Sequence, residues 1–143
     1  MPFLLIVNEF SWATHGSSQY LLVTYQYNRD AAQQYCNNNK AHLVDIESEE
    51  ENAYVSNLIK NGLSISAGIW TGINDQDTEG SFQKSDGTVQ NYFNWRHGEP
   101  NNDNGGQPEN CVDVSYTSKW NDNSCSTKLS FICERGRVIS LIL

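Results

Sequence analysis

The sequence predicts an α+β fold, with two helices in the first half of the chain and short strands joined by long loops in the second. Apolar residues recur at helical spacing before residue 63, whereas from Ile69 onward short apolar or aromatic runs alternate with Asn, Asp, Gly and Ser. The 143 residues are 38% hydrophobic, which is enough for one core, and no repeat or linker interrupts them. We therefore expect a single domain spanning residues 1–143.

The first predicted helix begins at an Asn28 cap and continues to about Asn39. This register puts Ala32 and Cys36 on one face, which is expected to be buried. The apolar run over 43–46 then predicts a short buried strand.

The second predicted helix begins at a capping box, because Ser48 is followed three residues later by Glu51. Gly62 is expected to end this helix. The residues expected to face the core are Tyr54, Val55, Leu58 and Ile59.

The second half of the chain contains predicted turns and one long polar loop. Ser85 to Thr88 reads as a hairpin turn, and residues 99–110 contain almost no apolar side chain. A loop of this kind cannot be ordered by a core of its own, so another interaction must hold it. Trp70, Trp95 and Trp120 lie in strand-like runs, where core packing is the expected role.

The composition argues against nucleic acid and membrane as partners. A formal net charge of −8 leaves few cations to neutralise phosphate. No apolar run approaches the roughly 20 residues that cross a bilayer. The two longest runs, residues 3–7 and 138–143, are expected to pair with each other or to contact a second copy.

The four cysteines predict two disulfides and an oxidising, extracellular compartment. A zinc site is disfavoured because no C-x₂-C pair exists and the surrounding loops are rich in oxygen donors. Three pairings of four cysteines remain open at this point. The cysteines are Cys36, Cys111, Cys125 and Cys133.

Oxygen-bearing side chains are concentrated in the same region as the long loop. Calcium takes about six to eight oxygen ligands, and carboxylates without a cation would repel one another. A calcium ion would therefore order a loop that has no core. The candidate donors are Glu99, Asn101, Asp103, Glu109, Asp113, Asn121 and Asp122.

Five short motifs occur in an order and spacing that resemble the C-type lectin domain, from about Tyr20 to Glu134. The resemblance implies the C-type lectin fold, with small antiparallel sheets and a long calcium-binding loop region. The chain looks like the short form of this domain, because no cysteine precedes Cys36. The motifs are Trp70 to Ile73, Phe93 to Trp95, Glu99 to Asn101, Glu109 to Cys111 and Trp120 to Asp122.

The resemblance also implies specific roles for individual residues. It pairs Cys36 with Cys133 and Cys111 with Cys125, and it implies a cis bond before Pro100. The primary calcium ligands, which would also contact sugar, are Glu99, Asn101, Glu109, Asn121 and Asp122. An auxiliary calcium site would use Asp75, Glu79, Asn102 and Asn110, with Asn where the family often has Asp.

In such a site, two vicinal sugar hydroxyls bind the calcium ion while they exchange hydrogen bonds with the Asn and Glu side chains. The order Glu99, Pro100, Asn101 implies a preference for mannose, glucose, N-acetylglucosamine or fucose. No aromatic residue lies between residues 101 and 110 to stack on galactose. A galactose-type lectin is the alternative, and a lectin-like domain that binds a protein or ice is the alternative of another class.

Other classes of function are disfavoured by the residues themselves. Residues 75–80 imitate the start of an EF-hand loop, but their flanks look like strands rather than helices. An enzyme is not expected, because carboxylates on calcium stay ionised and leave no general acid for a glycosidase. One sugar on an open ion should bind weakly, with a Kd on the order of 1 mM, so we expect a homo-oligomer.

Overall fold

The computed structural model describes residues 11–63, 68–103 and 105–136. The apolar segments 3–7 and 138–143 therefore lie outside the described residues. The helices are α1 (Arg29–Asn38) and α2 (Glu49–Gly62). The strands are β1 (Ala13–His15), β2 (Ser18–Tyr27), β3 (His42–Leu43), β4 (Ile69–Asn74), β5 (Cys111–Val114), β6 (Trp120–Asn123) and β7 (Leu129–Gly136).

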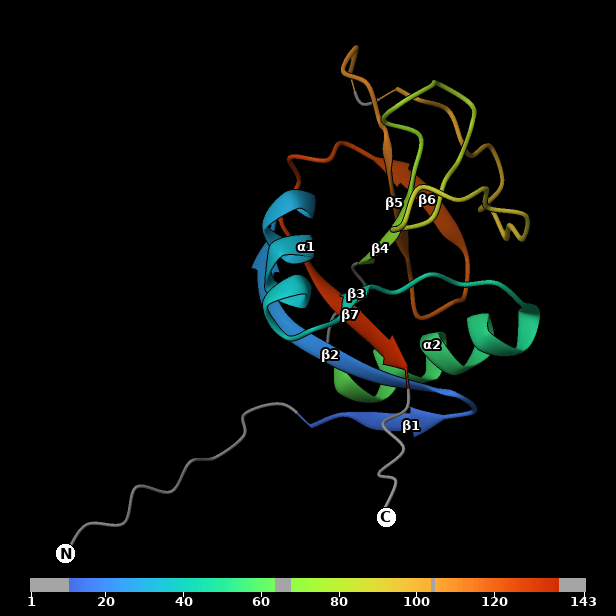
Figure 1. Cartoon of the computed structure of the whole chain (residues 1–143). Coiled ribbons are helices and arrows are strands. Elements are labelled where there is room, and N and C mark those ends of the chain that lie inside the picture. Colours follow the sequence, from blue (N-terminus) through green and yellow to red (C-terminus); the bar gives the residue numbers. More distant parts are fainter. Residues whose placement is uncertain (1–10, 64–67, 104, 137–143) are drawn as a thin grey trace, which may run out of the picture.

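The fold is α+β, as predicted, and the seven strands of the described residues form one sheet, six of them in the order β1-β2-β7-β4-β5-β6. Strand β3 also pairs with β7, and every pair is antiparallel except β4 with β7. The parallel pair Trp70 and Phe131 joins the two antiparallel halves. In Figure 1, the helices lie beside the half of the sheet that contains β2 and β7. The long connection between β4 and β5 lies at the other end, around β5 and β6.

Both helices begin where the sequence predicts. The Asn28 side chain accepts a hydrogen bond from the Ala31 amide, 2.9 Å away, and Ser48 accepts one from Glu51 at 3.1 Å. The Glu51 carboxylate reaches back to the amide of Glu47 at 2.8 Å, one residue before the cap. The bonds to Ala31 and Glu51 satisfy amides that the first helical turn leaves without partners, and the bond to Glu47 fixes the chain just before the cap.

Two apolar cores form on opposite faces of the sheet, because successive strand side chains point in opposite directions. Along β2, Tyr20 and Leu22 pack on the α2 side, whereas Leu21 and Val23 pack on the α1 side. The α2 core includes Val55, Ile59, Ile69, Val112, Trp120 and Ile132. The α1 core includes Ala32, Cys36, Leu43, Trp70, Phe131 and Cys133.

The strand predicted over residues 43–46 is shorter in the structure, where β3 ends at Leu43. The Val44 amide still donates to the Ile132 carbonyl at 2.9 Å, but the Asp45 amide donates to the Glu134 carboxylate at 3.1 Å rather than to a strand carbonyl, so the pairing goes no further. Val44 and Ile46 are nevertheless fully buried, as the apolar run indicates.

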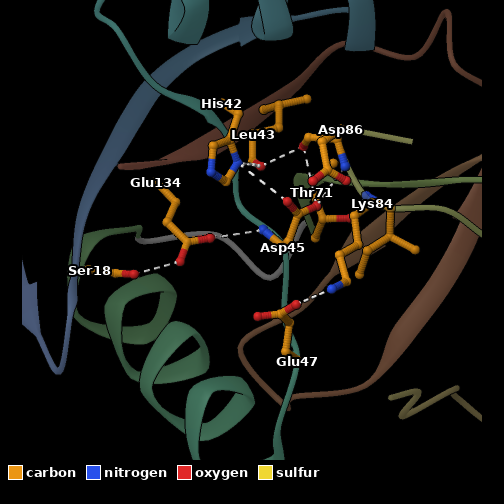
Figure 2. Close-up of polar contacts among 12 residues, drawn as sticks. Ser18, His42, Leu43, Asp45, Glu47, Thr71, Lys84, Asp86 and Glu134 are labelled. Atoms are coloured by element: carbon orange, nitrogen blue, oxygen red, sulfur yellow. Dashed lines mark hydrogen bonds and ion pairs between the residues drawn. The ribbon is translucent and has the colours of Figure 1, made fainter. Parts of the chain in front are cut away.

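A buried polar network fixes this segment against its neighbours (Figure 2). Glu134 accepts from the Ser18 hydroxyl at 2.9 Å as well as from Asp45, and burial together with the charge of Glu51 raises its pKa to about 7. Asp45 in turn accepts from the Ser85 amide at 2.9 Å. The network links β2 and β7 to the turn at the base of the long connection.

The connection between β4 and β5 has little regular structure. The turn at residues 85–88 forms, with the Lys84 amide 2.8 Å from the Thr88 carbonyl. Gln83 and Trp95 make only isolated bridges, so the runs around them are not full strands. Trp70 and Trp120 are fully buried, and Trp95 is partly buried against the α2 core.

Two disulfides close the fold, with the pairing that the resemblance implies. Cys36 bonds to Cys133 across 97 residues, and Cys111 bonds to Cys125 across 14. Among the described residues, neither helix is long and apolar enough to cross a membrane.

Candidate functional site

The candidate site lies where the long connection runs beside β6. The Trp120 amide donates to the Asn94 carbonyl at 3.0 Å, and the Arg96 amide donates to the Trp120 carbonyl at 2.8 Å. A turn follows, in which the Glu99 amide donates to the Arg96 carbonyl at 2.9 Å, and the bond between Glu99 and Pro100 is cis. These contacts bring Glu99 next to the residues that follow Trp120.

Three carboxylates meet at this place. One oxygen each from Glu99, Glu109 and Asp122 lies within 4.8 Å of the others. The Glu99 side chain is 4% exposed, and Glu109 and Asp122 are 6% and 1% exposed as residues. Glu99 Oε1 is buried and accepts no hydrogen bond from the described residues. This is an incompletely satisfied cluster of oxygen donors.

A chain of hydrogen bonds clamps the polar loop to β6. Asp122 accepts from the amides of Asn101 at 3.1 Å and Asn102 at 2.6 Å, one on each carboxylate oxygen. Asn102 Oδ1 then accepts from the Glu109 amide at 2.9 Å, and Glu109 Oε1 accepts from the Asp103 amide at 3.2 Å. Asn102 has a φ of 51°, a left-handed conformation that Asn tolerates better than most residues. The loop is thus ordered by side-chain oxygens instead of apolar packing.

The surroundings of Glu99 and Glu109 disfavour the charged forms of these two acids. Burial and the charge of Asp122 raise the pKa of Glu109 to about 7, and the same two causes raise the pKa of Glu99. A cation bound between them would remove this penalty. The oxygen-only donor set, its burial and the unsatisfied Glu99 oxygen all fit a hard divalent cation such as calcium.

Both asparagines predicted as primary ligands lie beside the cluster, with their oxygens already engaged. Asn101 Oδ1 accepts from the Asp103 amide at 3.1 Å. Asn121 Oδ1 accepts from Arg96 at 3.3 Å, and its amide nitrogen donates to Asp113 at 3.3 Å. The structure therefore brings the three carboxylates together, whereas the side-chain oxygens of Asn101 and Asn121 are hydrogen-bonded to Asp103 and Arg96 instead.

Comparison with known proteins decides the family. The family described as the Lectin C-type domain matches residues 25–135. The chain belongs to this family.

Relatives of this C-type lectin domain include lithostathine from Rattus norvegicus, which is 34% identical and aligns over 83% of this chain and 76% of its own. Among solved structures, the carbohydrate-recognition domain of the mouse scavenger receptor C-type lectin has a TM-score of 0.80 at 28% identity, covering 91% of this chain and 97% of that one. The domain of cow CD23, determined in the presence of a GlcNAc2Man3 oligosaccharide, also has a TM-score of 0.80, with 32% identity and coverage of 90% and 95%.

The residues predicted for an auxiliary calcium site in this C-type lectin domain are only partly gathered. A hydrogen bond with Asp75, burial and the charges of Asp75 and Asp122 raise the pKa of Glu79 to about 6, so these acids lie close together. The Asp75 amide donates to the Asn110 carbonyl at 3.0 Å, and Asn110 Oδ1 is buried and finds no hydrogen-bond partner in the part of the chain that the structure describes. Asn102 would have to leave the Glu109 amide to join them, and its role there stays a prediction.

Two residues outside the five predicted primary ligands contact the site of this C-type lectin domain: Arg96, which no sequence motif singles out, and Asp113, which the sequence indicates only as a candidate oxygen donor. Arg96 contacts Glu99 as well as Asn121, and Asp113 accepts from both Asn121 and Asn123. Arg96 precedes Glu99 by three residues, so the turn between them carried a signal for this contact. Asp113 faces Asn121 across the β5–β6 pair, which only the strand register reveals.

Proposed function

We propose that this C-type lectin domain binds carbohydrate through a calcium ion held by Glu99, Asn101, Glu109, Asn121 and Asp122. The observation that carries the proposal is the convergence of three buried carboxylates within 4.8 Å. Buried acidic groups of this kind need a compensating charge, and hydrogen-bonded amides alone supply only part of it.

The donor set supports calcium more than another metal. It consists of carboxylate and amide oxygens, without histidine or thiolate, which is the choice of a hard cation. Calcium bound there would offer remaining coordination positions to two sugar hydroxyls. Asn101 and Asn121 would turn their oxygens to the ion, and their amide groups would then be free to donate to the sugar.

We further propose that the sugar is of the mannose, glucose, N-acetylglucosamine or fucose type. The sequence Glu99, Pro100, Asn101 supports this preference through the order of acceptor and donor that it presents. Large apolar side chains that are exposed in the described residues are Tyr25, Val89, Phe93 and Tyr116, and none of them lies between residues 96 and 110. No described ring of the loop itself therefore offers the stacking expected for galactose.

The competing functions predict different results in the same assay. A galactose-type lectin would share the calcium dependence but would reverse the order of sugars. A domain that binds protein or ice would respond to neither sugar. A calcium-independent type II antifreeze protein has a TM-score of 0.76 at 22% identity, a likeness that extends to the fold alone.

The remaining features of the proposal follow from the same chemistry. The carboxylates would be ionised on calcium, which supports binding without catalysis. Disulfides are typical of secreted proteins, so we propose an extracellular location for a single domain of residues 1–143. Because one sugar on one ion binds weakly, we also propose that copies of the chain act together as a homo-oligomer.

Calcium removal is the direct test of this function. We expect the full chain to be retained on immobilised mannose in millimolar calcium and to be released by a chelator. Free mannose should compete better than free galactose. Retention that persists in chelator, or that neither sugar reduces, would contradict the proposal.

Exchanging the acid Glu99 and the amide Asn101 tests the sugar preference separately. The double change Glu99→Gln with Asn101→Asp reverses the order of donor and acceptor at the ion without changing the net charge. We expect the ratio of mannose to galactose affinity to fall by about tenfold or more, since two hydrogen bonds change polarity. Calcium titration of the same variant is the control, and an unchanged ranking on a glycan array would refute the specificity argument.

A further inference from the structure

Arg96 is an exposed cation that contacts two of the five proposed calcium ligands. Its Nη2 atom lies 3.3 Å from Asn121 Oδ1 and 3.5 Å from Glu99 Oε2. The Arg96 side chain is 63% exposed, whereas that of Glu99 is 4% exposed. A guanidinium in solvent thus reaches a carboxylate that is otherwise buried.

The position of Arg96 is set by the backbone on both sides. Its amide donates to the Trp120 carbonyl, immediately before Asn121, and its carbonyl accepts from the Glu99 amide. Asn121 follows Trp120 in the chain, and the Glu99 backbone is itself hydrogen-bonded to Arg96, so both side chains that the guanidinium contacts are held close to it. The contact follows from the turn and does not depend on a long reach of the side chain.

A calcium ion would require the same oxygens that Arg96 contacts. Asn121 directs Oδ1 to Arg96 and its amide nitrogen to Asp113, so Oδ1 must leave Arg96 to join an ion. The guanidinium would then face a divalent cation of the same sign across a few ångströms.

Resting on the calcium site proposed above, we propose that Arg96 is a resident cation that competes with calcium for Glu99 and Asn121. Without calcium, Arg96 holds these two side chains at the mouth of the site. With calcium, it is displaced into solvent. Arg96 therefore raises the calcium concentration at which the domain becomes competent to bind sugar, and it acts as a positioning residue without touching the sugar.

Substitution of Arg96 by glutamine tests this role by two measurements on the full chain. We expect calorimetric titration to give a calcium Kd about three- to tenfold lower for Arg96→Gln than for the wild type, the effect of removing one exposed like charge. In chelator, the variant should melt about 1–3 °C lower, because Glu99 loses its cation. The melting experiment does not depend on calcium or sugar.

Two further variants separate the contact from the charge. Lys128→Gln removes the same charge from an exposed position just before β7, and it should leave both measurements unchanged. Arg96→Lys keeps the charge and should stay within about twofold of the wild-type calcium Kd. An Arg96→Gln variant that binds calcium as the wild type does, or more weakly, would overturn the inference and leave the proposed function intact. A wild-type protein that binds no calcium at millimolar concentration would overturn both.

Discussion

Replacing Asp122 with alanine should abolish calcium-dependent sugar binding. Asp122 is 1% exposed and contributes a carboxylate oxygen to the cluster with Glu99 and Glu109. Its two oxygens also hold the amides of Asn101 and Asn102. The substitution removes a ligand and loosens two others, so we expect the calcium Kd to rise by about a hundredfold or more.

Melting curves with and without calcium separate the loss of calcium binding in Asp122→Ala from the loss of the hydrogen bonds that Asp122 accepts. Calcium in hundredfold excess over its Kd should stabilise the wild type by about 2.7 kcal/mol, and Asp122→Ala should lose this increment. In chelator, the same variant loses two hydrogen bonds to a charged acceptor, and relief of the repulsion with Glu99 and Glu109 offsets part of that loss. We therefore expect a smaller destabilisation in chelator than in calcium.

The matched variant is Asp122→Asn, which removes the charge and keeps one acceptor oxygen. It should lose calcium binding as fully as Asp122→Ala but melt closer to the wild type in chelator. Equal melting temperatures for the two variants in chelator would mean that the hydrogen bonds to the loop contribute nothing. Calcium binding by either variant would contradict the assignment of Asp122 as a ligand.

Replacing Trp120 with alanine should cause the largest loss of stability among single changes at the site. Trp120 is fully buried in the α2 core, and its ring packs edge-on against Tyr92 and Trp95. Its Nε1 atom donates to Asn52 Oδ1 at 2.8 Å. Truncation of a buried Trp costs about 3–5 kcal/mol, and the buried Asn52 acceptor left without a donor adds to it.

Chemical denaturation in chelator measures that loss, and Trp70→Ala provides the comparison. Trp70 is equally buried but packs in the α1 core, where its Nε1 atom donates to the Tyr27 carbonyl at 3.0 Å. Both variants should be destabilised by several kcal/mol, but only Trp120→Ala should weaken calcium binding in the fraction that remains folded. Equal calcium affinities would show that the packing around Trp120 does not position Glu99 and Asn121.

Much of the fold could be read from the sequence because its signals are local. The starts of helix α1 after Asn28 and of α2 after Ser48 were predictable, because each cap and the apolar stripe that follows it lie within a few residues of each other. The end of β3 could not be read in this way. Asp45 leaves the ladder because its amide meets Glu134, which lies 89 residues further along the chain.

The same distinction holds for the site. The residue types of Glu99, Glu109 and Asp122 predict oxygen chemistry, but only the β5–β6 register and the Trp95–Trp120 bridge bring them together. The partners of the amide oxygens were not predictable, because Asn101 binds within its own loop and Asn121 binds Arg96. These hydrogen bonds depend on the rotamer of each Asn side chain, and the spacing of residues in the sequence does not reveal the rotamer.

The hydrogen-bond clamp on the polar loop has a consequence for protein engineering. Asp122 anchors the loop at Asn101 and Asn102, and Asn102 anchors its return at Glu109, so the two ends are tied to the same point of β6. The intervening residues 105–107 are exposed. Sequence libraries can therefore be confined to that stretch, with the flanking anchors unchanged, to obtain binders with altered recognition on a scaffold whose two disulfides and both cores are left as they are.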